Sequence, residues 1–271
     1  MIQDNLFNYK KFVFLKWGLV LILASSLAYL FDQPRISANG GTPLGYTLGT
    51  IGALLIVWLM WFGIRKRQYY KQAGNLRAWV SAHIYLGLAL SVVATLHTGF
   101  QIGWNLHSLA YVLTMATIAS GVWGLGFYLR YPSEMSRVLN QRSPEQIVAE
   151  IDGLDKEAQK LLKNAEAAVR RQVEQSINQG IFNSAAQRRR GSVKNCATQQ
   201  AVDFLQNELT RSESVAALHA NQVQRLRALK QLRRYHGLRY WLELWLAVHV
   251  PLSFGLLAAL IGHVLSVFIY W

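Results

Sequence analysis

Four histidines lie in otherwise apolar parts of this 271-residue chain, in two pairs of identical spacing. His83 and His97 are fourteen residues apart, and His249 and His263 are separated by the same interval. Fourteen residues make about four turns of helix, so both members of a pair share one helix face, about 21 Å apart along the axis. Because an imidazole in lipid is costly without a partner, two matched pairs predict two cofactors at different depths of a membrane.

The ligand chemistry favours iron porphyrin over zinc. A zinc site needs cysteine or carboxylate near each histidine pair, whereas the apolar segments contain no cysteine and only Glu243 as an acid. Two axial imidazoles on a planar haem need no further protein ligand. The one cysteine, Cys196, leaves no CxxCH motif for covalent attachment, so we expect two non-covalent b-type haems. A proton or ion relay is the main alternative, because a single histidine in a membrane is more often a hydrogen-bonded or relay group than a ligand.

Apolar runs define the elements that must position these histidines. Five segments are each long enough to span the hydrocarbon of a bilayer, namely 12–31, 44–64, 79–100, 107–129 and 240–271. The first ends in a long span followed by Asp32 and Pro34, so we expect it to be retained and not cleaved as a signal peptide. The predicted fold is an all-α membrane protein with five transmembrane helices, a bundle that binds two haems and a helical insert.

Charge predicts the orientation of the spans. Of the 28 Lys and Arg residues, 27 lie before or at the start of the first span or in the second or fourth connection, and only Arg35 lies on the other side. The positive-inside rule therefore places the N-terminus and the insert in the cytoplasm and Trp271 outside a plasma (inner) membrane. The third and fifth spans are then parallel, so His83 pairs with His249 at the inner level and His97 with His263 at the outer level. Sidedness alone explains the net charge of +14, and we expect no nucleic-acid partner.

Other residues were considered for roles beside the haems. Small residues leave room between helices, and the candidates are Gly49, Gly52, Gly87, Gly121, Gly124, Gly126, Gly255 and Gly262, with ordinary close packing as the alternative. Arg65, Arg67 and Arg77 lie near the inner level and are candidates to bind haem propionates or to anchor the interface. His107 begins the fourth span on the outer side, where we favour a hydrogen bond to a propionate or to a quinone, or no role, over ligation.

The long connection is the least membrane-like part, and the predicted domains are 1–130, 131–239 and 240–271. Pro132 is expected to end the fourth span, and Ser143 to cap a helix that begins at Pro144. Two heptad-like runs predict an antiparallel cytoplasmic hairpin with arms of about 50 Å. The runs are Ile147, Ile151, Leu154, Ala158, Leu161, Ala165 and Ala168, then Val202, Leu205, Leu209, Ser212, Ala216, His219, Val223 and Leu226. The hairpin either docks a redox partner protein or sister subunit, or packs on itself with a basic tip that is solvated or touches membrane lipid. His219 and His236 are expected to be solvated.

The arrangement of histidines resembles a known family. One pair at this spacing on the third span and another on the fifth is similar to the ferric-reductase-like transmembrane cytochromes, which include the membrane halves of ferric reductases and NADPH oxidases. The resemblance covers roughly residues 46–130 and 240–271 and rests on His83, His97, His249 and His263 with their spans. It implies that these histidines ligate two haems that carry electrons across the bilayer. The chain differs in having five predicted spans where the family commonly has six, and no flavin or nicotinamide domain.

Signatures of a self-contained enzyme are missing from the sequence. There is no Gly-rich phosphate loop, no paired carboxylate within a span and no nucleophile beside a base. A haem with two axial histidines has no open iron position, which suits electron transfer better than substrate activation. We therefore expect an electron conduit whose oxidoreductase chemistry is completed by a partner or by a quinol site at one membrane face. Two other classes stay open: a proton or ion transporter with a histidine relay, and a cofactor-free scaffold subunit of a membrane complex.

Overall fold

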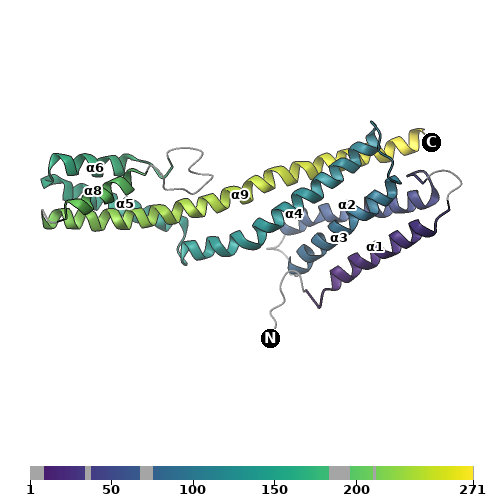
Figure 1. The fold of residues 1–271 in the computed structure, drawn as a ribbon, viewed down its shortest axis with the longest axis horizontal. Coiled ribbons are helices and arrows are strands. Elements are labelled where there is room, and N and C mark those ends of the chain that lie inside the picture. Colours follow the sequence, from purple (N-terminus) through teal and green to yellow (C-terminus); the bar gives the residue numbers. More distant parts are fainter. Residues whose placement is uncertain (1–8, 34–37, 68–75, 183–195, 210–211, 271) are drawn as a thin grey trace. The chain divides into compact units, whose positions relative to one another are not determined.

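Helices account for all the regular structure in the described part of the chain, which comprises residues 9–33, 38–67, 76–182, 196–209 and 212–270 of a computed structural model. The helices are α1 (Val13–Phe31), α2 (Pro43–Arg67), α3 (Leu76–Thr98), α4 (Leu106–Leu139), α5 (Pro144–Leu161), η1 (Leu162–Asn164), α6 (Ala167–Asn178), α8 (Ala197–Asn207) and α9 (Glu213–Tyr270) (Figure 1). Five of them, α1, α2, α3, α4 and α9, are long and apolar enough to cross a membrane. The predicted all-helical class and the five spans are confirmed.

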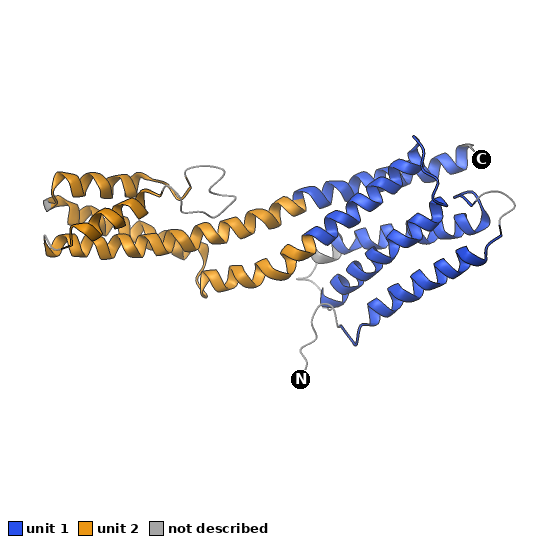
Figure 2. Cartoon of the chain, in the orientation of Figure 1, with its two compact units in different colours: residues 1–123, 247–271 blue, residues 124–246 orange. Residues whose placement is uncertain are grey.

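The chain divides into two compact units (Figure 2). One, here called the membrane unit, comprises residues 1–123 and 247–271, and the other, the insert unit, comprises residues 124–246. The sequence placed the corresponding boundaries after residues 130 and 239. They differ because α4 and α9 are each continuous across the predicted boundary.

The membrane unit is held together by apolar contacts among four of its helices. Ile56 and Leu59 of α2, Leu90 of α3 and Leu256 of α9 form a buried cluster, and Leu113 and Ile118 of α4 pack against it. α1 is joined to α3 by close backbone approach, because a Cβ at Gly18 would lie 3.2 Å from the carbonyl oxygen of Tyr85. Most large apolar side chains of α1 remain exposed, as expected for a helix that faces lipid rather than water.

Local sequence explains the first helix of the insert unit. The hydroxyl of Ser143 accepts a hydrogen bond from the Gln146 backbone N–H (3.2 Å), and the Gln146 side chain accepts one from the Ser143 N–H (2.8 Å). This capping box, with Pro144 in the first turn, begins α5 where the sequence predicted it. The predicted apolar positions Ile147, Ile151, Leu154 and Ala158 are all buried.

The insert is helical, but the prediction of two long arms was wrong. The first run breaks at η1, and the guanidinium of Arg170 donates to the carbonyls of Leu162 (3.2 Å) and Lys163 (3.3 Å) at that break. The second run breaks before α9, where the hydroxyl of Ser212 accepts a hydrogen bond from the Val215 N–H (3.3 Å). Ser212, a weak heptad position in the predicted second run, is therefore a helix cap. The first predicted arm becomes α5 and α6, and the second becomes α8 and the first part of the long helix α9.

The second run also has a different buried face from the predicted one. Val215, Leu218 and Gln222 are buried where the sequence had placed Ala216, His219 and Val223, one position further along the chain. The shift follows from the break. Because α9 begins at Glu213, its buried face is set from that residue and does not continue the periodicity of the first part of the run.

The two insert histidines are not solvated as predicted. The Nε2 atom of His219 is buried. The ring of His236 makes edge-to-face contacts with those of Phe182 and Tyr235, with centroids 5.3 Å apart in each pair.

Pro132 does not end α4, contrary to the sequence prediction. It lies inside the helix, which continues to Leu139 and ends where Asn140 and Gln141 adopt left-handed φ values of 47° and 64°. A proline removes one backbone hydrogen bond, but the helix resumes when the following turns are stabilised by packing. Leu139 packs against the buried cluster formed by Ile147 and Leu229, which provides such stabilisation.

Shortening Leu218 tests the observed register of α9. Its side chain is fully buried with Leu205 and Val173, so Leu218→Ala should destabilise the insert unit by about 2–5 kcal/mol. Gln224→Ala, at an exposed position of the same helix, should change stability by about 0.5 kcal/mol or less. Urea unfolding of the protein in detergent, followed by circular dichroism, measures both. Equal midpoints for the two variants would contradict the register.

Candidate functional site

Three histidines from three helices meet at the end of the membrane unit where α3 ends and α4 begins. The rings of His97 (α3) and His263 (α9) have centroids 6.0 Å apart and planes at 84°. His107 at the start of α4 lies against His263, with centroids 4.5 Å apart and the two Nδ1 atoms at 2.5 Å. The structure therefore brings together the two residues that the sequence paired at this level, and adds His107.

The ring of His97 is oriented by the backbone of α2. Its Nδ1 lies 2.8 Å from the carbonyl oxygen of Gly45. A carbonyl oxygen only accepts hydrogen bonds, so Nδ1 carries the hydrogen and the lone pair of this imidazole is on Nε2. A histidine ligand whose other ring nitrogen donates to a carbonyl has the tautomer that metal coordination requires.

Two glycines make room for the His97 ring. A Cβ at Gly49 would lie 2.6 Å from Cε1 of His97, and one at Gly40 would lie 3.1 Å from the same atom. The first distance is shorter than any real carbon contact, so α2 can approach α3 here only without a side chain at position 49. Gly49 was among the small residues selected from the sequence, whereas Gly40 and the Gly45 carbonyl were not. A backbone acceptor has no sequence signal.

The inner histidine of α9 is oriented in a comparable way by α4. The Nδ1 of His249 lies 2.8 Å from the hydroxyl of Ser120, which itself donates to the carbonyl of Thr117 at 2.7 Å. Because that hydroxyl uses its one hydrogen on Thr117, it accepts from Nδ1, and the lone pair of His249 is again on Nε2. A Cβ at Gly121 would lie 3.4 Å from Cε1 of His249, so Gly121 also packs on the ring. Sequence reasoning missed Ser120, although it is a small polar residue in an apolar span.

His83 has a buried ring nitrogen without a protein partner. Its Nδ1 is buried and makes no hydrogen bond with the described residues, and the same holds for the hydroxyl of Thr117. The ring packs against Phe62, with centroids 5.0 Å apart. Unsatisfied buried polar atoms are uncommon, so two of them in the half of the unit that holds His249 favour a bound group or water there.

The separation of the His97 and His263 rings can be compared with that of two imidazoles bound to one iron. Metal–imidazole bonds are about 2 Å long, and each ring centre lies about 1 Å beyond its bonding nitrogen, so two axial imidazoles have centroids about 6 Å apart. The 6.0 Å between His97 and His263 matches that value. In the described part of the chain, no group of three or more His, Cys, Asp or Glu side chains is placed to hold a metal ion. The donor set therefore fits a haem, which brings its own four nitrogens, better than a tetrahedral metal centre.

Of the two candidate propionate ligands, Arg77 and Arg65, the structure describes the side chain of Arg77 alone. Arg77 is exposed in the first turn of α3. Arg65 lies in the last turn of α2, and its side chain is outside the described residues, as is that of Arg67. Their role beside an inner haem stays a prediction.

The remaining glycines selected from the sequence do not contact the histidines. Gly52 and Gly87 face leucine side chains, Gly262 faces Leu106, Gly124 faces the ring of Trp245, and Gly126 and Gly255 have no neighbouring atom within 4 Å of a built Cβ. For these positions, ordinary helix packing or lipid exposure is the better explanation.

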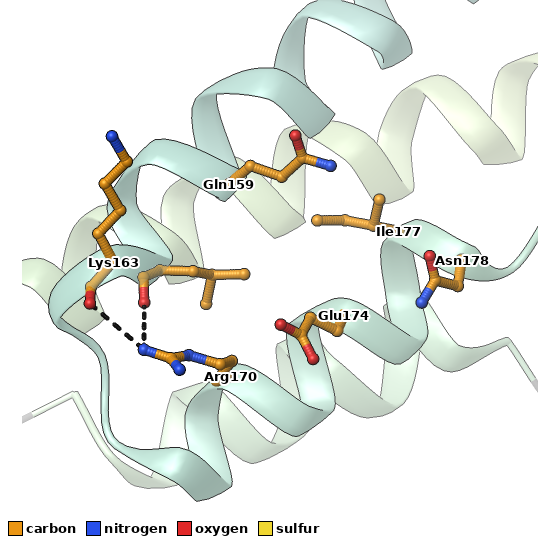
Figure 3. A pocket seen from close by; sticks show the side chains of 7 residues that line it. Gln159, Lys163, Arg170, Glu174, Ile177 and Asn178 are labelled. Atoms are coloured by element: carbon orange, nitrogen blue, oxygen red, sulfur yellow. Dashed lines mark hydrogen bonds between the residues drawn. The ribbon is translucent and has the colours of Figure 1, made fainter.

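The insert unit contains a surface pocket of about 520 Å³ between the end of α5 and α6 (Figure 3). Gln159, Lys163, Arg170, Glu174 and Asn178 contribute polar groups to its lining. The Arg170 guanidinium is directed to the Leu162 and Lys163 carbonyls, so it caps the helix end. The lining contains no nucleophile beside a base, and the pocket suggests no reaction.

Comparison of the chain with protein-family models, curated proteins and solved structures found no match. The function is therefore argued from the site itself.

Gly49 provides a test of the site geometry. Gly49→Ala would place a methyl group 2.6 Å from the His97 ring, and we expect a loss of about 1–3 kcal/mol and a lower thermal midpoint in detergent. Gly52→Ala is the matched control one turn further along α2. Its Cβ would meet Leu90 at 3.7 Å, an ordinary contact, so stability should be unchanged or raised. The geometry would be contradicted if Gly49→Ala were as stable as the control.

Proposed function

We propose that this protein is a membrane cytochrome that transfers electrons through two bis-histidine b-type haems. The observation that carries the proposal is the convergence of His97 and His263 at a ring separation of 6.0 Å, with the His97 tautomer set by the Gly45 carbonyl. His83 and His249, the predicted inner pair, also support the proposal. The Nδ1 of His249 faces Ser120, so its Nε2 lone pair is directed away from that residue. The histidine pattern is similar to that of the ferric-reductase-like cytochromes, and the proposal extends their haem chemistry to this chain.

The protein residues hold and orient the haems in this proposal. His83 and His249 would hold one haem, and His97 and His263 would hold the other. When bound, each haem supplies a reversible one-electron change at iron. The Gly45 carbonyl and the Ser120 hydroxyl keep the ring hydrogens of His97 and His249 on Nδ1, so Nε2 stays available. Apolar side chains such as Leu90 and Leu256 exclude water from the bundle.

Membrane sidedness and partners complete the proposal. Five apolar helices fit a multi-pass membrane protein, and the distribution of Lys and Arg supports a cytoplasmic N-terminus in a plasma membrane. An electron conduit needs a donor and an acceptor, which we propose to be a redox partner protein, a sister subunit or a quinone. The insert unit has two buried clusters of its own, more structure than haem binding needs, and this supports a docking role.

Removing single histidines tests the two haem sites separately. His83→Ala or His249→Ala should remove the inner haem and leave the outer one, and His97→Ala or His263→Ala should do the reverse, because each haem needs both axial ligands. Pyridine haemochrome titration should fall from two haems per chain to one in each variant. His236→Ala, in the insert unit, is the control and should keep two. Two haems per chain in both His83→Ala and His97→Ala would refute the ligand assignment.

A proton relay is the second candidate function, and one observation favours it. The Nδ1 atoms of His107 in α4 and His263 in α9 lie 2.5 Å apart. A separate hydrogen bond of 3.1 Å joins Thr95 in α3 to Tyr111 in α4. Imidazoles in direct contact can pass a proton from one to the next. This candidate explains the outer cluster, but it does not use the matched inner pair.

His107 separates the two candidates. In a cytochrome, His97 and His263 fill both axial positions of the outer haem, so His107→Ala should retain two haems per chain. In a relay, the same change should abolish proton movement into vesicles, measured with an internal pH dye. Loss of the outer haem in His107→Ala, with His97→Ala harmless, would reassign the outer ligand to His107.

A further inference from the structure

A third histidine lies in direct contact with one of the proposed haem ligands. The Nδ1 atoms of His107 and His263 are 2.5 Å apart, and the two ring planes meet at 89°. A neutral imidazole has one N–H and one nitrogen lone pair, so two ring nitrogens can approach this closely only when one donates and the other accepts. The contact therefore fixes which nitrogen carries the hydrogen in both rings.

The first turn of α4 is held in place independently of these two side chains. The side-chain oxygen of Asn105 accepts a hydrogen bond from the Ser108 N–H at 2.9 Å, as a helix cap does. Leu106 packs directly on α9, because a Cβ at Gly262 would lie 3.2 Å from its Cδ2 atom. The meeting of the two imidazoles is therefore set by the packing of α4 on α9.

The surroundings of the two rings favour His263 as the donor. His107 is exposed, so an N–H on its Nε2 can bond water, whereas His263 is partly buried and has no other hydrogen bond with the described residues. With its hydrogen on Nε2, His263 would have an N–H without a protein partner, and such groups are rare in protein interiors. With its hydrogen on Nδ1, the N–H is used in the bond to His107 and the lone pair is on Nε2.

We propose that His107 is a positioning residue for the haem ligand His263, and that its Nδ1 accepts the hydrogen bond from the Nδ1–H of His263. The inference rests on the proposed cytochrome function and assigns a role to a histidine that this proposal does not use as a ligand. His107 keeps the lone pair of His263 on Nε2, as the Gly45 carbonyl does for His97. The contact then acts without moving a proton, which distinguishes this role from a relay.

The chemical nature of the acceptor affects the haem as well as the ligand. An acceptor that bonds the free N–H of a ligating imidazole raises the basicity of that ligand. A more basic ligand stabilises the ferric form, and hydrogen bonding around the iron is one of the ways in which a protein sets the reduction potential. The haem held by His97 and His263 should therefore have a lower potential with His107 than without it.

Redox titration of the haems in detergent, followed by visible absorption, tests the inference. His107→Leu removes the acceptor and should raise the midpoint potential of one haem by about 59 mV or more, a tenfold change in its reduction equilibrium. The potential of the second haem should not shift. In the His83→Ala background, where the outer haem is expected alone, the shift should appear in the single remaining titration wave.

Two matched variants separate the hydrogen bond from simple packing. His107→Asn places an oxygen acceptor near the position of Nδ1 and should reverse at least half of the shift seen with leucine. Tyr111→Phe, one turn further along α4, removes the hydroxyl that bonds Thr95 at 3.1 Å and leaves all three histidines in place. It should leave both potentials unchanged.

The possible results separate this inference from the proposal on which it rests. A wild-type protein without haem would refute both. Two haems with unchanged potentials in His107→Leu would overturn the role of His107 and leave the cytochrome proposal standing, and a shift of equal size in His107→Asn or Tyr111→Phe would do the same. Loss of the outer haem in both His107→Leu and His107→Asn would instead make His107 a ligand.

Discussion

The cost of placing an imidazole among apolar helices governs the membrane unit. Four histidines lie in its spans, and each polar ring nitrogen must bond a protein group or bind something else. The Nδ1 of His97 bonds the Gly45 carbonyl, and the Nδ1 of His249 bonds the Ser120 hydroxyl. In both rings Nε2 is left unprotonated. For His97, the neighbouring helix α2 can approach closely enough because Gly49 has no side chain to hold it apart.

Features of the fold that depend on helical periodicity and composition could be predicted from the sequence. Features that depend on a single local hydrogen bond could not. The five spans, the α5 cap at Ser143 and the buried face of Ile147 to Ala158 follow from apolar length and helical periodicity. The breaks after Leu161 and before Glu213 do not, since Arg170 and Ser212 act there through specific hydrogen bonds. For the site, residue type and spacing selected four histidines, and the structure brings two of them, His97 and His263, together. The groups that orient them were missed, because a carbonyl such as that of Gly45 is present at every residue and only the fold selects one.

In the insert unit, buried polar side chains are hydrogen-bonded to one another. Ser176, Thr198, Gln222 and Arg225 form a buried hydrogen-bonded network that Asp155 neutralises. Such a network costs desolvation but fixes one helix register, because any rotation of α9 would leave several groups unpaired at once. This explains why α9 buries Gln222 and Arg225 in place of the apolar residues that a simple heptad would require.

The two orienting hydrogen bonds differ in how they respond to genetic change. The acceptor for His97 is the main-chain carbonyl of Gly45, and a Cβ at this position would lie 2.3 Å from the Asn39 carbonyl oxygen, so any side chain there would shift the backbone that carries the acceptor. The acceptor for His249 is a serine hydroxyl, which a single codon change to alanine would remove. The His97 environment therefore requires glycine at position 45, while the His249 environment can change in small steps at position 120. Among related sequences, residue 120 should vary more than residue 45.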